Sequence, residues 1–360
     1  MLVPLVEAEA PTCGGKAAAL GALLRAGLPV PDGFVVPFEV YDAAVCDFER
    51  HRDQRDDPGA VDDTFARRPL QPAVFQALEH ALDELGDPPV AVRSSAADED
   101  ASGASAAGQY ESILGVRGVA DVADAVRVCW ASLHAPRAAA YRTLAGEEGS
   151  VAEHLAMAVI VHRHLDAGVA GVMFTPVGAG EPTVLEASWG LGPSIVAGTV
   201  TPDTYRIHPD GTVTCVVGDK RTRLDRIGFE VRVAGVPVER RQQHTLDDAT
   251  ATRLAKLGRT VAAVLGAPQD IEWALEDGRL WLLQARPITA TPPALRPPDA
   301  APSGPLTLAG TPGSSGTATG TARTVRGPQD FAHVQPGDIL ICPTTDPAWT
   351  PLLRIAAGVV

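Results

Sequence analysis

Short apolar runs separated by turn signals dominate the chain, and longer helical patterns interrupt them. Apolar and small residues at helical spacing predict helices over residues 14–26, 119–142 and 246–265. Shorter runs rich in branched apolar residues predict strands. These predicted strands cover residues 33–37, 90–95, 155–165, 170–176, 183–190 and the hairpin 204–218.

Two further turn signals predict how strands pair. Asp277 and Gly278 lie at the centre of residues 269–288, and an Asp-Gly pair between apolar runs predicts a two-residue hairpin turn. The polar turn at residues 166–168 predicts that strand 170–176 runs back beside strand 155–165.

The composition changes once along the chain. Residues 289–305, TATPPALRPPDAAPSGP, are Pro-rich and show no apolar periodicity, which is typical of a semi-rigid linker. We therefore expect a large domain over residues 1–288 and a second, glycine-rich unit over residues 306–360. The end of that unit, GDILICPTTDPAWTPLLRIAAGVV, predicts a strand, a Pro-rich turn, a helix and a second strand.

Composition and charge narrow the classes of function. The 360 residues are 45% apolar and 21% charged, which is typical of a globular protein. The net charge of −14 argues against nucleic acid or an anionic membrane as the main partner, although a local basic pocket could still hold a nucleotide. No apolar run approaches the roughly 20 residues that span a bilayer. The five scattered cysteines form no CxxC pair, so we expect reduced thiols and a cytoplasmic location.

The first candidate for phosphate chemistry is GGK at residues 14–16. A P-loop would need Gly and Thr or Ser where the chain has Ala10 and Ala17, so that interpretation fails. Backbone N–H groups at a helix start beside a lysine nevertheless suit a phosphate. Only three lysines occur against 27 arginines, which makes Lys16 more informative. The alternative is the start of a surface helix.

The second candidate is VRSSAADEDASGASAAGQYESILGV, residues 92–116. Arg93 leaves a predicted strand and enters a loop of Ser, Ala and Gly that continues to Gly108. Small residues let a backbone approach a ligand closely, and hydroxyl and N–H groups can bind phosphate oxygens. The alternative is a Ser/Ala loop without a ligand.

The third candidate lies on the hairpin of residues 269–288. Glu272 and Gln284 lie on facing strands at similar distances from the turn, and Gln284 shares a strand face with Arg286. An acid, an amide and a guanidinium on one patch of sheet can hold a divalent ion and a polyphosphate. The alternative is a structural ion pair between Glu272 and Arg286.

Two other patterns are weaker. His162 and His164 share a strand face, so an HxH metal site is conceivable, but a third ligand is not evident and surface histidines are the alternative. The glycine-rich segment GLGPSIVAGTVTPDTY lacks GxGxxG and leads to Pro202, so a Rossmann site is not expected.

Taken in order, five segments resemble the ATP-binding domain of phosphoenolpyruvate synthase, pyruvate phosphate dikinase and rifampin phosphotransferase. These are GGKAAALGALLRAGLPVPDGFVVP, VRSSAADEDASGASAAGQYESILGV, GVMFTP, GLGPSIVAGTVTPDTY and DIEWALEDGRLWLLQARPI, and together they cover about residues 1–290. TPGSSGTATGTARTV and the C-terminal residues resemble the start of the same family's swivelling phosphohistidine domain.

The resemblance implies an α/β (α+β) fold of the ATP-grasp class and a reaction that needs ATP and Mg²⁺. In this family ATP loses its γ- and β-phosphates, AMP remains, and the β-phosphoryl group passes to a histidine on the swivelling domain. Each motif residue then has an implied role. Lys16, Arg93 and Arg286 would contact phosphates, Gly108 and Ser112 would lie in the loop over the phosphates, Glu272 and Gln284 would hold Mg²⁺, and His162 would lie near the adenine where the family generally has glutamine.

The phosphoryl-accepting histidine has no counterpart in the sequence. In the family it lies in a Thr-x-x-Gly-Gly-x-x-Ser-His segment that follows a GVV like the one ending at Val360, and none of the nine histidines has this context. We therefore expect the chain to be an ATP-binding phosphotransferase module whose small-molecule acceptor, pyruvate or another, binds a domain outside this sequence.

Three alternatives remain. They are a non-catalytic, ATP-binding regulatory module, an antibiotic kinase resembling rifampin phosphotransferase, and a generic ATP-grasp ligase that forms an acyl phosphate. The swivelling segment directly follows the ATP-binding domain, as in phosphoenolpyruvate synthase and the dikinase, whereas in rifampin phosphotransferase the substrate domain intervenes.

Overall fold

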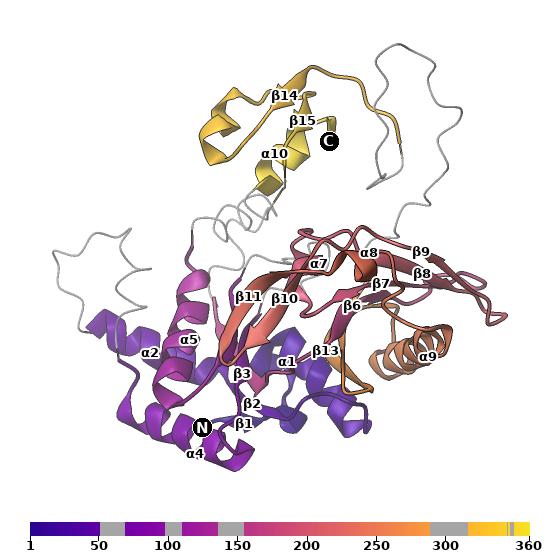
Figure 1. The fold of residues 1–360 in the computed structure, drawn as a ribbon. Helices are drawn as coiled ribbons and strands as arrows, with labels where there is room; N and C mark the ends of the chain where they lie inside the picture. Colours follow the sequence, from indigo (N-terminus) through magenta and orange to yellow (C-terminus); the bar gives the residue numbers. More distant parts are fainter. Residues whose placement is uncertain (51–68, 98–109, 136–154, 289–315, 344, 346–348) are drawn as a thin grey trace, which may run out of the picture. The chain divides into compact units, whose positions relative to one another are not determined.

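The computed structural model describes residues 1–50, 69–97, 110–135, 155–288, 316–343, 345 and 349–360. These residues form two compact units, Met1–Ile288 and Thr289–Val360 (Figure 1). The predicted linker 289–305 lies outside the described residues. Among the described helices, the structure contains none with the length and apolarity that a membrane crossing requires.

The first unit contains a five-stranded antiparallel sheet. Its order is β1 (Val3–Pro4), β2 (Gly33–Val36), β5 (Met157–Arg163), β3 (Val90–Ala96) and β4 (Ser112–Val116). The central strand β5, MAVIVHR, is buried along all but its last residue. An apolar run without polar alternation is typical of a strand covered on both faces.

Helices cover both faces of this sheet. One face packs against α2 (Phe38–Arg50), α4 (Pro72–Leu85) and α5 (Val119–Ser132), which Figure 1 shows on one side. The other face packs against α1 (Ala10–Arg25), which follows the 3₁₀ turn Leu5–Glu7. The sequence predicted α1 and α5 but not α4.

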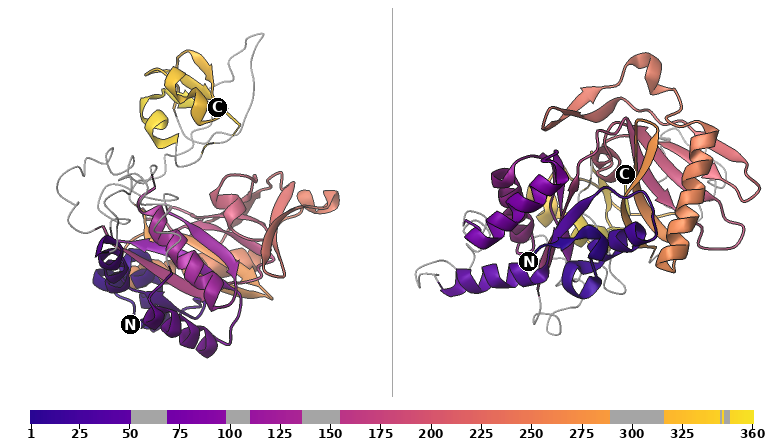
Figure 2. Two further views of the ribbon diagram at one scale, coloured as in Figure 1. Left: turned by 90° about the vertical axis from the view of Figure 1, so that its left-hand side faces the viewer. Right: turned by 90° about the horizontal axis from the view of Figure 1, so that it is seen from below.

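A six-stranded antiparallel sheet forms the rest of the core of the first unit. Its order is β13 (Arg279–Pro287), β12 (Gln269–Glu276), β6 (Val169–Phe174), β7 (Thr183–Trp189), β8 (Asp203–Ile207) and β9 (Val213–Val216). Helix α9 (Asp248–Leu265) runs along one face (Figure 2). The opposite face carries Glu272 and Gln284, which pair across the hairpin, and a small apolar cluster that includes Ala170 and Ala274.

One predicted strand pairing is wrong. Strands β5 and β6, joined by the turn at residues 166–168, do not pair with each other. Instead, β5 lies between β2 and β3 in the five-stranded sheet, whereas β6 lies between β12 and β7 in the other. Both edges of β5 are occupied by partners distant in sequence, so the turn carries the chain from one sheet to the other.

The two predicted hairpins are confirmed. β8 pairs with β9, and β12 pairs with β13 across Asp277 and Gly278. Both turn residues have positive φ, 48° and 76°, which is the requirement of a type I′ turn. The turn sets the register from Glu276–Arg279 to Trp273–Leu282, and a β-bulge at Leu283 then shifts it, so that Glu272 lies directly opposite Gln284.

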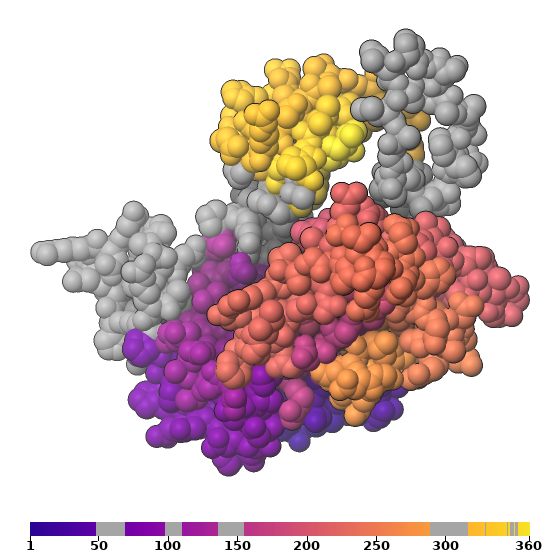
Figure 3. Space-filling view, viewed as in Figure 1, coloured from indigo at the N-terminus to yellow at the C-terminus, as the bar shows by residue number. Residues whose placement is uncertain are grey.

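A third hairpin was not predicted. β10 (Thr222–Ile227) and β11 (Glu230–Gly235) form a separate two-stranded ribbon on the surface of the first unit (Figure 3). Near its base, Leu191 N–H donates to Leu224 O at 2.8 Å. At its tip, a Cβ on Gly115 of β4 would lie 2.3 Å from Phe229 O. The ribbon therefore contacts both sheets. The short helix α8 (Val238–Arg241) follows the ribbon in sequence, whereas the short helix α7 (Pro193–Val196) lies between β7 and β8.

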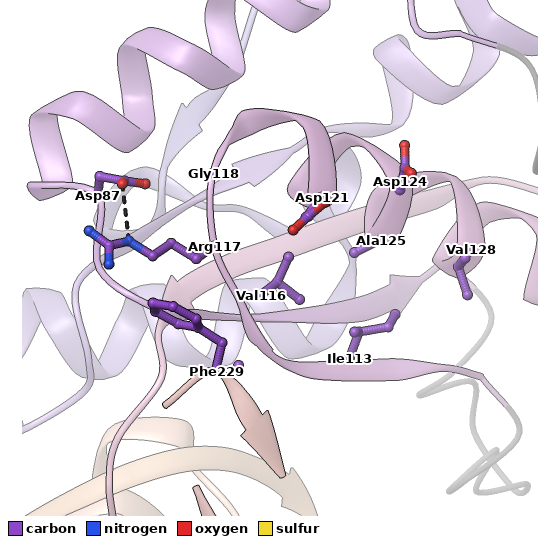
Figure 4. Close-up of a pocket in the computed structure, with 11 residues that line it drawn as sticks. Asp87, Ile113, Val116, Arg117, Gly118, Asp121, Asp124, Ala125, Val128 and Phe229 are labelled. Atoms are coloured by element: carbon purple, nitrogen blue, oxygen red, sulfur yellow. Dashed lines mark hydrogen bonds and ion pairs between the residues drawn. The ribbon is translucent and has the colours of Figure 1, made fainter. Parts of the chain in front are cut away.

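The tip of this ribbon borders a cavity of about 760 Å³. Figure 4 shows Arg117 over the ring of Phe229, 5.2 Å from its centroid, and paired with Asp87 at 3.2 Å. Ile113, which lines the cavity, pairs with Val92 on the sheet face that packs against α4 and α5.

The second unit contains three parallel strands. Their order is β14 (Ala322–Thr324), β15 (Ile339–Ile341) and β16 (Gly358–Val359), with the 3₁₀ helix Pro328–His333 and α10 (Thr350–Ile355) between them. Its apolar centre includes Val325, Leu340, Trp349 and Leu352. The predicted order of strand, helix and strand at the end of the chain is confirmed.

A fully buried ion pair ties the six-stranded sheet to the loops beside it. Asp203 and Lys220 are both 0% exposed and form an ion pair. Asp203 Oδ1 also accepts the N–H of Gly218 at 2.9 Å, and Oδ2 accepts the N–H and hydroxyl of Thr245 at 2.8 and 2.9 Å. Each oxygen of this carboxylate therefore faces two donors, and a buried charge needs such compensation.

Two histidines at the end of β5 are also buried. His162 is 3% exposed and His164 is 8% exposed. Burial is the largest cause that lowers the pKa of each to about 4, and the charges of Arg93 and Arg226 respectively lower it further. Both imidazoles are therefore neutral at pH 7.

We expect Lys220→Met to destabilise the protein by about 3–5 kcal/mol, because the Asp203 carboxylate is left buried without its counter-charge. Adding Asp203→Asn should recover part of that loss. Arg232→Met, which breaks the exposed Arg232–Glu230 pair, should change the free energy of unfolding by only about 0.5 kcal/mol. Urea unfolding measures all three; a loss below about 1 kcal/mol for Lys220→Met would contradict the prediction.

The buried histidines predict a pH dependence of stability. Between about pH 6.5 and 4 the unfolded chain binds protons that the folded imidazoles do not, so stability is lost as pH falls through this window. From pH 7 to 5 each histidine should lower the free energy of unfolding by roughly 2 kcal/mol.

Substitution separates this effect from general acid sensitivity. His162→Gln should lose less stability between pH 7 and 5 than the wild type does, measured by urea unfolding at each pH. His80, whose side chain is 79% exposed, offers the matched control, and His80→Gln should follow the wild-type profile. Parallel profiles for His162→Gln and wild type would refute the prediction.

Candidate functional site

Arg93 joins the two sheets of the first unit through its guanidinium group. From β3 of the five-stranded sheet, its Nη2 donates to Glu272 Oε2 at 2.7 Å and to Gln284 Oε1 at 2.8 Å. Its Nη1 donates to the carbonyl oxygen of Leu283 at 3.0 Å. The side chains of Arg93 and Glu272 are only 13% and 22% exposed. One cation thus meets an acid, an amide and a carbonyl of the neighbouring sheet.

A β-bulge in the hairpin presents these acceptors to Arg93. Glu272 pairs with Gln284 while the next residue, Trp273, pairs with Leu282, so Leu283 has no partner across the hairpin. A bulge of this kind re-aims local groups and is frequent beside functional sites. Here the carbonyl of the unpaired residue accepts from Arg93.

The surrounding cations set the charge of Glu272. Burial alone would raise its pKa, but the charge and hydrogen bond of Arg93 outweigh burial, and Lys16 and Arg286 act in the same direction. The pKa of Glu272 therefore lies below its ordinary value, and the side chain is a carboxylate at neutral pH. The action of Lys16 on Glu272 also brings the first and third sequence candidates into one electrostatic site.

Lys16 lies just after an interruption in α1. Gly14 has φ 78° and ψ 166°, so a new helical segment begins after it. Ser95 of β3 braces this point: its hydroxyl accepts Ala17 N–H at 3.2 Å and donates to Cys13 O at 2.8 Å. A Cβ at Gly14 would lie 2.5 Å from Ser95 Oγ, so only glycine fits. A helix start is thereby held two residues along β3 from Arg93.

Asp270 and Glu186 were not found by sequence analysis. Arg286 pairs with Asp270 at 2.6 Å rather than forming the Glu272–Arg286 pair considered from the sequence. Burial raises the pKa of Asp270 against the opposing effect of Arg286, and burial and Asp270 raise the pKa of Glu186. Asp270 could have been found, since it lies two residues before Glu272 on the predicted hairpin. It lies directly opposite Arg286 because of the bulge at Leu283.

Glu186 belongs to the same polar surface. It pairs with Val172 of β6, which in turn pairs with Glu272, so these residues share one face of the sheet. The sequence offered no signal for this, because β7 reaches the hairpin only through β6. The result is a row of acidic groups along the sheet face opposite α9.

The structure also places the remaining candidates. Ser112 is exposed at the start of β4 and pairs with Arg93. His162 shares the face of Arg93, because Ala91 pairs with His162 and Arg93 with Ile160. Gly108 lies outside the described residues.

A metal site built from protein side chains alone is not supported by the residues that the structure describes. The residues that the structure describes contain no group of three or more His, Cys, Asp or Glu arranged to hold an ion, so the HxH interpretation gains nothing. Glu272 and Gln284 offer one carboxylate and one amide oxygen. Such oxygen donors fit Mg²⁺, which typically takes one or two carboxylates and completes its coordination with phosphates and water.

The cavity of Figure 4 is a different place. Its lining residue Ile113 faces the α4 and α5 side of the five-stranded sheet, whereas Arg93, adjacent to the partner of Ile113, points to the other side. The candidate site around Arg93 is therefore identified by its charged side chains and does not coincide with this cavity.

Comparison with known proteins identifies the family of the chain. Residues 10–300 match the family described as pyruvate phosphate dikinase, AMP/ATP-binding domain. A probable phosphoenolpyruvate synthase of Methanothermobacter thermautotrophicus is 35% identical over 373 residues, covering 96% of this chain and 54% of the relative. The prodigiosin synthesizing transferase PigC of Serratia marcescens is 37% identical over 291 residues, covering 77% of this chain and 31% of that protein.

Among solved structures, the D-alanine-D-alanine ligase of Coxiella burnetii covers 77% of this chain and 48% of its own at 10% identity, with a TM-score of 0.32. A likeness this distant carries no argument about function. The mixed α/β architecture, with two sheets that meet at Arg93, is the one expected of an ATP-grasp fold. The chain spans about half the length of the Methanothermobacter relative. By its match over most of its length, the chain belongs to the pyruvate phosphate dikinase AMP/ATP-binding domain family.

Proposed function

We propose that this chain binds Mg-ATP where its two sheets meet at Arg93, and that it is the ATP-using part of a phosphotransferase. The observation that carries the proposal is the contact of Arg93 with both Glu272 and Gln284. In this contact, a cation of the kind that binds phosphate lies next to two oxygen groups of the kind that binds Mg²⁺. Phosphoryl transfer depends mainly on positioning and charge neutralisation, which such groups supply.

Each side chain has a role in this proposal. Lys16, Arg93 and Arg286 neutralise and orient the phosphates, and backbone N–H groups at the helix start after Gly14 add donors. Glu272 and Gln284 supply oxygen ligands for Mg²⁺. The ion, when bound, neutralises charge on the phosphate oxygens and holds them in place.

Binding would require an exchange of partners at Arg93. In the structure Glu272 and Gln284 satisfy the guanidinium. Phosphate oxygens are equally good acceptors for a guanidinium. When they take over these donors, Glu272 and Gln284 are released toward a cation. The exchange keeps every buried charge compensated, which limits its free-energy cost.

For the later steps, we propose that the β-phosphoryl group passes to a histidine and that AMP is left. None of the chain's nine histidines lies in the motif expected around that acceptor. The second unit, Thr289–Val360, would be the start of the swivelling domain that carries it. Pyruvate or another small molecule would then receive the group; the Methanothermobacter relative is a probable phosphoenolpyruvate synthase.

A second candidate is an ATP-binding regulatory module without turnover. His162, which stands where the resembled family generally has glutamine, favours it. The two candidate functions differ in what becomes of bound ATP. AMP released from ATP in the presence of an intact swivelling domain from a relative supports the phosphotransferase, and ATP bound without cleavage supports the regulatory module.

Lysine substitution tests the phosphate site. Lys16→Met should weaken Mg-ATP binding at least about tenfold, because one charge-assisted contact is lost. Lys256→Met is the matched control, since Lys256 is exposed on α9, and it should bind as the wild type does. Isothermal titration calorimetry measures both. Wild-type protein that is folded yet binds no Mg-ATP would end the proposal.

Metal removal tests the assigned ligands. Removal of Mg²⁺ with EDTA should weaken the binding of ATP to the wild-type protein by about tenfold or more, because the negative charge of the phosphates is then less neutralised. Glu272→Gln should lose most of this Mg²⁺ dependence while keeping metal-free ATP binding, since Arg93 and Lys16 remain. An unchanged Mg²⁺ dependence in Glu272→Gln would show that Glu272 is not a ligand.

A further inference from the structure

The ribbon of β10 and β11 lies against the sheet face that carries the proposed ATP site. Residues directly opposite each other in neighbouring strands share a face. One row across β7, β6, β12 and β13 consists of Glu186, Val172, Glu272 and Gln284. The next row on this face consists of Ser188, Ala170, Ala274 and Trp281. Leu224 and Val231 of the ribbon pack in one apolar cluster with residues of that second row. The ribbon therefore covers the row beside Glu272.

The covered row contains polar atoms that lack partners among the described residues. Ser188 Oγ and Trp281 Nε1 are buried without a hydrogen bond, and so is Arg226 Nε of the ribbon. Arg226 lies opposite Val231 in the ribbon, so it belongs to the face that packs on the sheet. Buried polar groups without partners are uncommon and unfavourable. A polar ligand that extends from the phosphate site under the ribbon would supply the missing partners.

The base of the ribbon is held by its backbone. Leu191 N–H donates to Leu224 O at 2.8 Å. A Cβ on the adjacent Gly190 would lie 2.2 Å from the same oxygen, so the two segments touch closely. This contact joins the ribbon to the end of β7 in the six-stranded sheet.

The tip of the ribbon is held mainly by side chains at the surface. Arg117 lies 5.2 Å from the ring centroid of Phe229 and 3.2 Å from Asp87 (Figure 4). The side chains of Arg117 and Asp87 are 46% and 42% exposed. Exposed ion pairs and exposed cation–π contacts each contribute little to stability. The tip is therefore the end that releases more easily.

We propose that the ribbon is a strap over the bound nucleotide, and that the contact of Arg117 with Phe229 and Asp87 is a latch that sets how fast nucleotide enters and leaves. This inference rests on the proposed binding of ATP at Arg93. When the latch opens, the ribbon moves about its base and uncovers the row of Ser188 and Trp281.

The latch acts on rates and not on affinity. Its residues line the cavity of Figure 4, which does not coincide with the candidate site. The latch therefore stabilises the closed ribbon equally with and without nucleotide. A contact that does not distinguish the free state from the bound state leaves the binding equilibrium unchanged.

Binding kinetics test the latch. Rapid mixing with Mg²⁺ and mant-ATP, a fluorescent derivative of ATP, gives the association rate, and displacement by excess ATP gives the dissociation rate. Arg117→Met keeps a long side chain and removes the charge that holds Asp87 and Phe229. Both rates should rise about threefold to tenfold, as expected for the loss of one exposed ion pair and one cation–π contact. The dissociation constant should change by less than about twofold, because both rates rise together.

Two further variants attribute the effect to the latch. Phe229→Ala removes the ring and should raise both rates in the same way. Combining it with Arg117→Met should add little, because both residues belong to one contact. Arg232→Met is the matched control on the same ribbon. It breaks the exposed pair with Glu230 and should keep the wild-type rates. Thermal melts establish that each variant is folded.

Hydrogen exchange gives a second readout that needs no labelled nucleotide. The backbone amides of residues 222–235 exchange when the ribbon opens, so their exchange reports the open population. Arg117→Met should speed this exchange by about the same factor as the binding rates, whereas Arg232→Met should not.

The outcomes separate this proposal from the proposed ATP site. Wild-type rates and wild-type exchange in Arg117→Met and Phe229→Ala would overturn the latch and leave the ATP site standing. A changed dissociation constant without a parallel rise of both rates would overturn it as well. Folded wild type that binds neither mant-ATP nor ATP would overturn both proposals.

Discussion

The ion pair between Arg93 and Glu272 is the constraint on which the candidate site depends. It is the point at which a cation from one sheet meets an acid from the other, and both side chains are mostly buried. A buried cation requires acceptors with good geometry, and the bulge at Leu283 supplies one of them. These contacts hold β3 of one sheet against the hairpin of the other. In the proposed complex with ATP, the guanidinium of Arg93 would donate to phosphate instead.

Local patterns predicted much of this site. The Asp-Gly turn predicted the hairpin, which puts Glu272 and Gln284 on facing strands. The bulge at Leu283, which the sequence did not predict, brings these two residues directly opposite each other. GGK marked a helix start, and the structure contributes what no local pattern holds, namely the Ser95 hydroxyl that braces it. The roles of Lys16, Arg93, Ser112, His162 and Arg286 in binding ATP stay predictions, as does that of Gly108.

The failures came from long-range organisation. Strands β5 and β6 are neighbours in sequence with a turn between them, yet they belong to different sheets, because both edges of β5 pair with strands distant in sequence, β2 and β3. Glu186 joins the polar surface only through β6, and the ribbon of β10 and β11 lacks the continuous apolar run that marks a core strand. Sequence periodicity reports which face of an element is buried, but it does not report which sheet the element joins.

The central position of β5 also has a consequence for the order in which the protein forms during synthesis. Strands β2 and β3 both pair with β5, which is made last of the three. At about 5–20 residues per second, roughly 3–13 s separate the synthesis of β3 from that of β5. Glu272 follows Arg93 by 179 residues, so their pair closes later still. Until β5 is made, β2 and β3 present unpaired edges. The nascent chain is therefore most exposed to misassembly while its central strand is still on the ribosome.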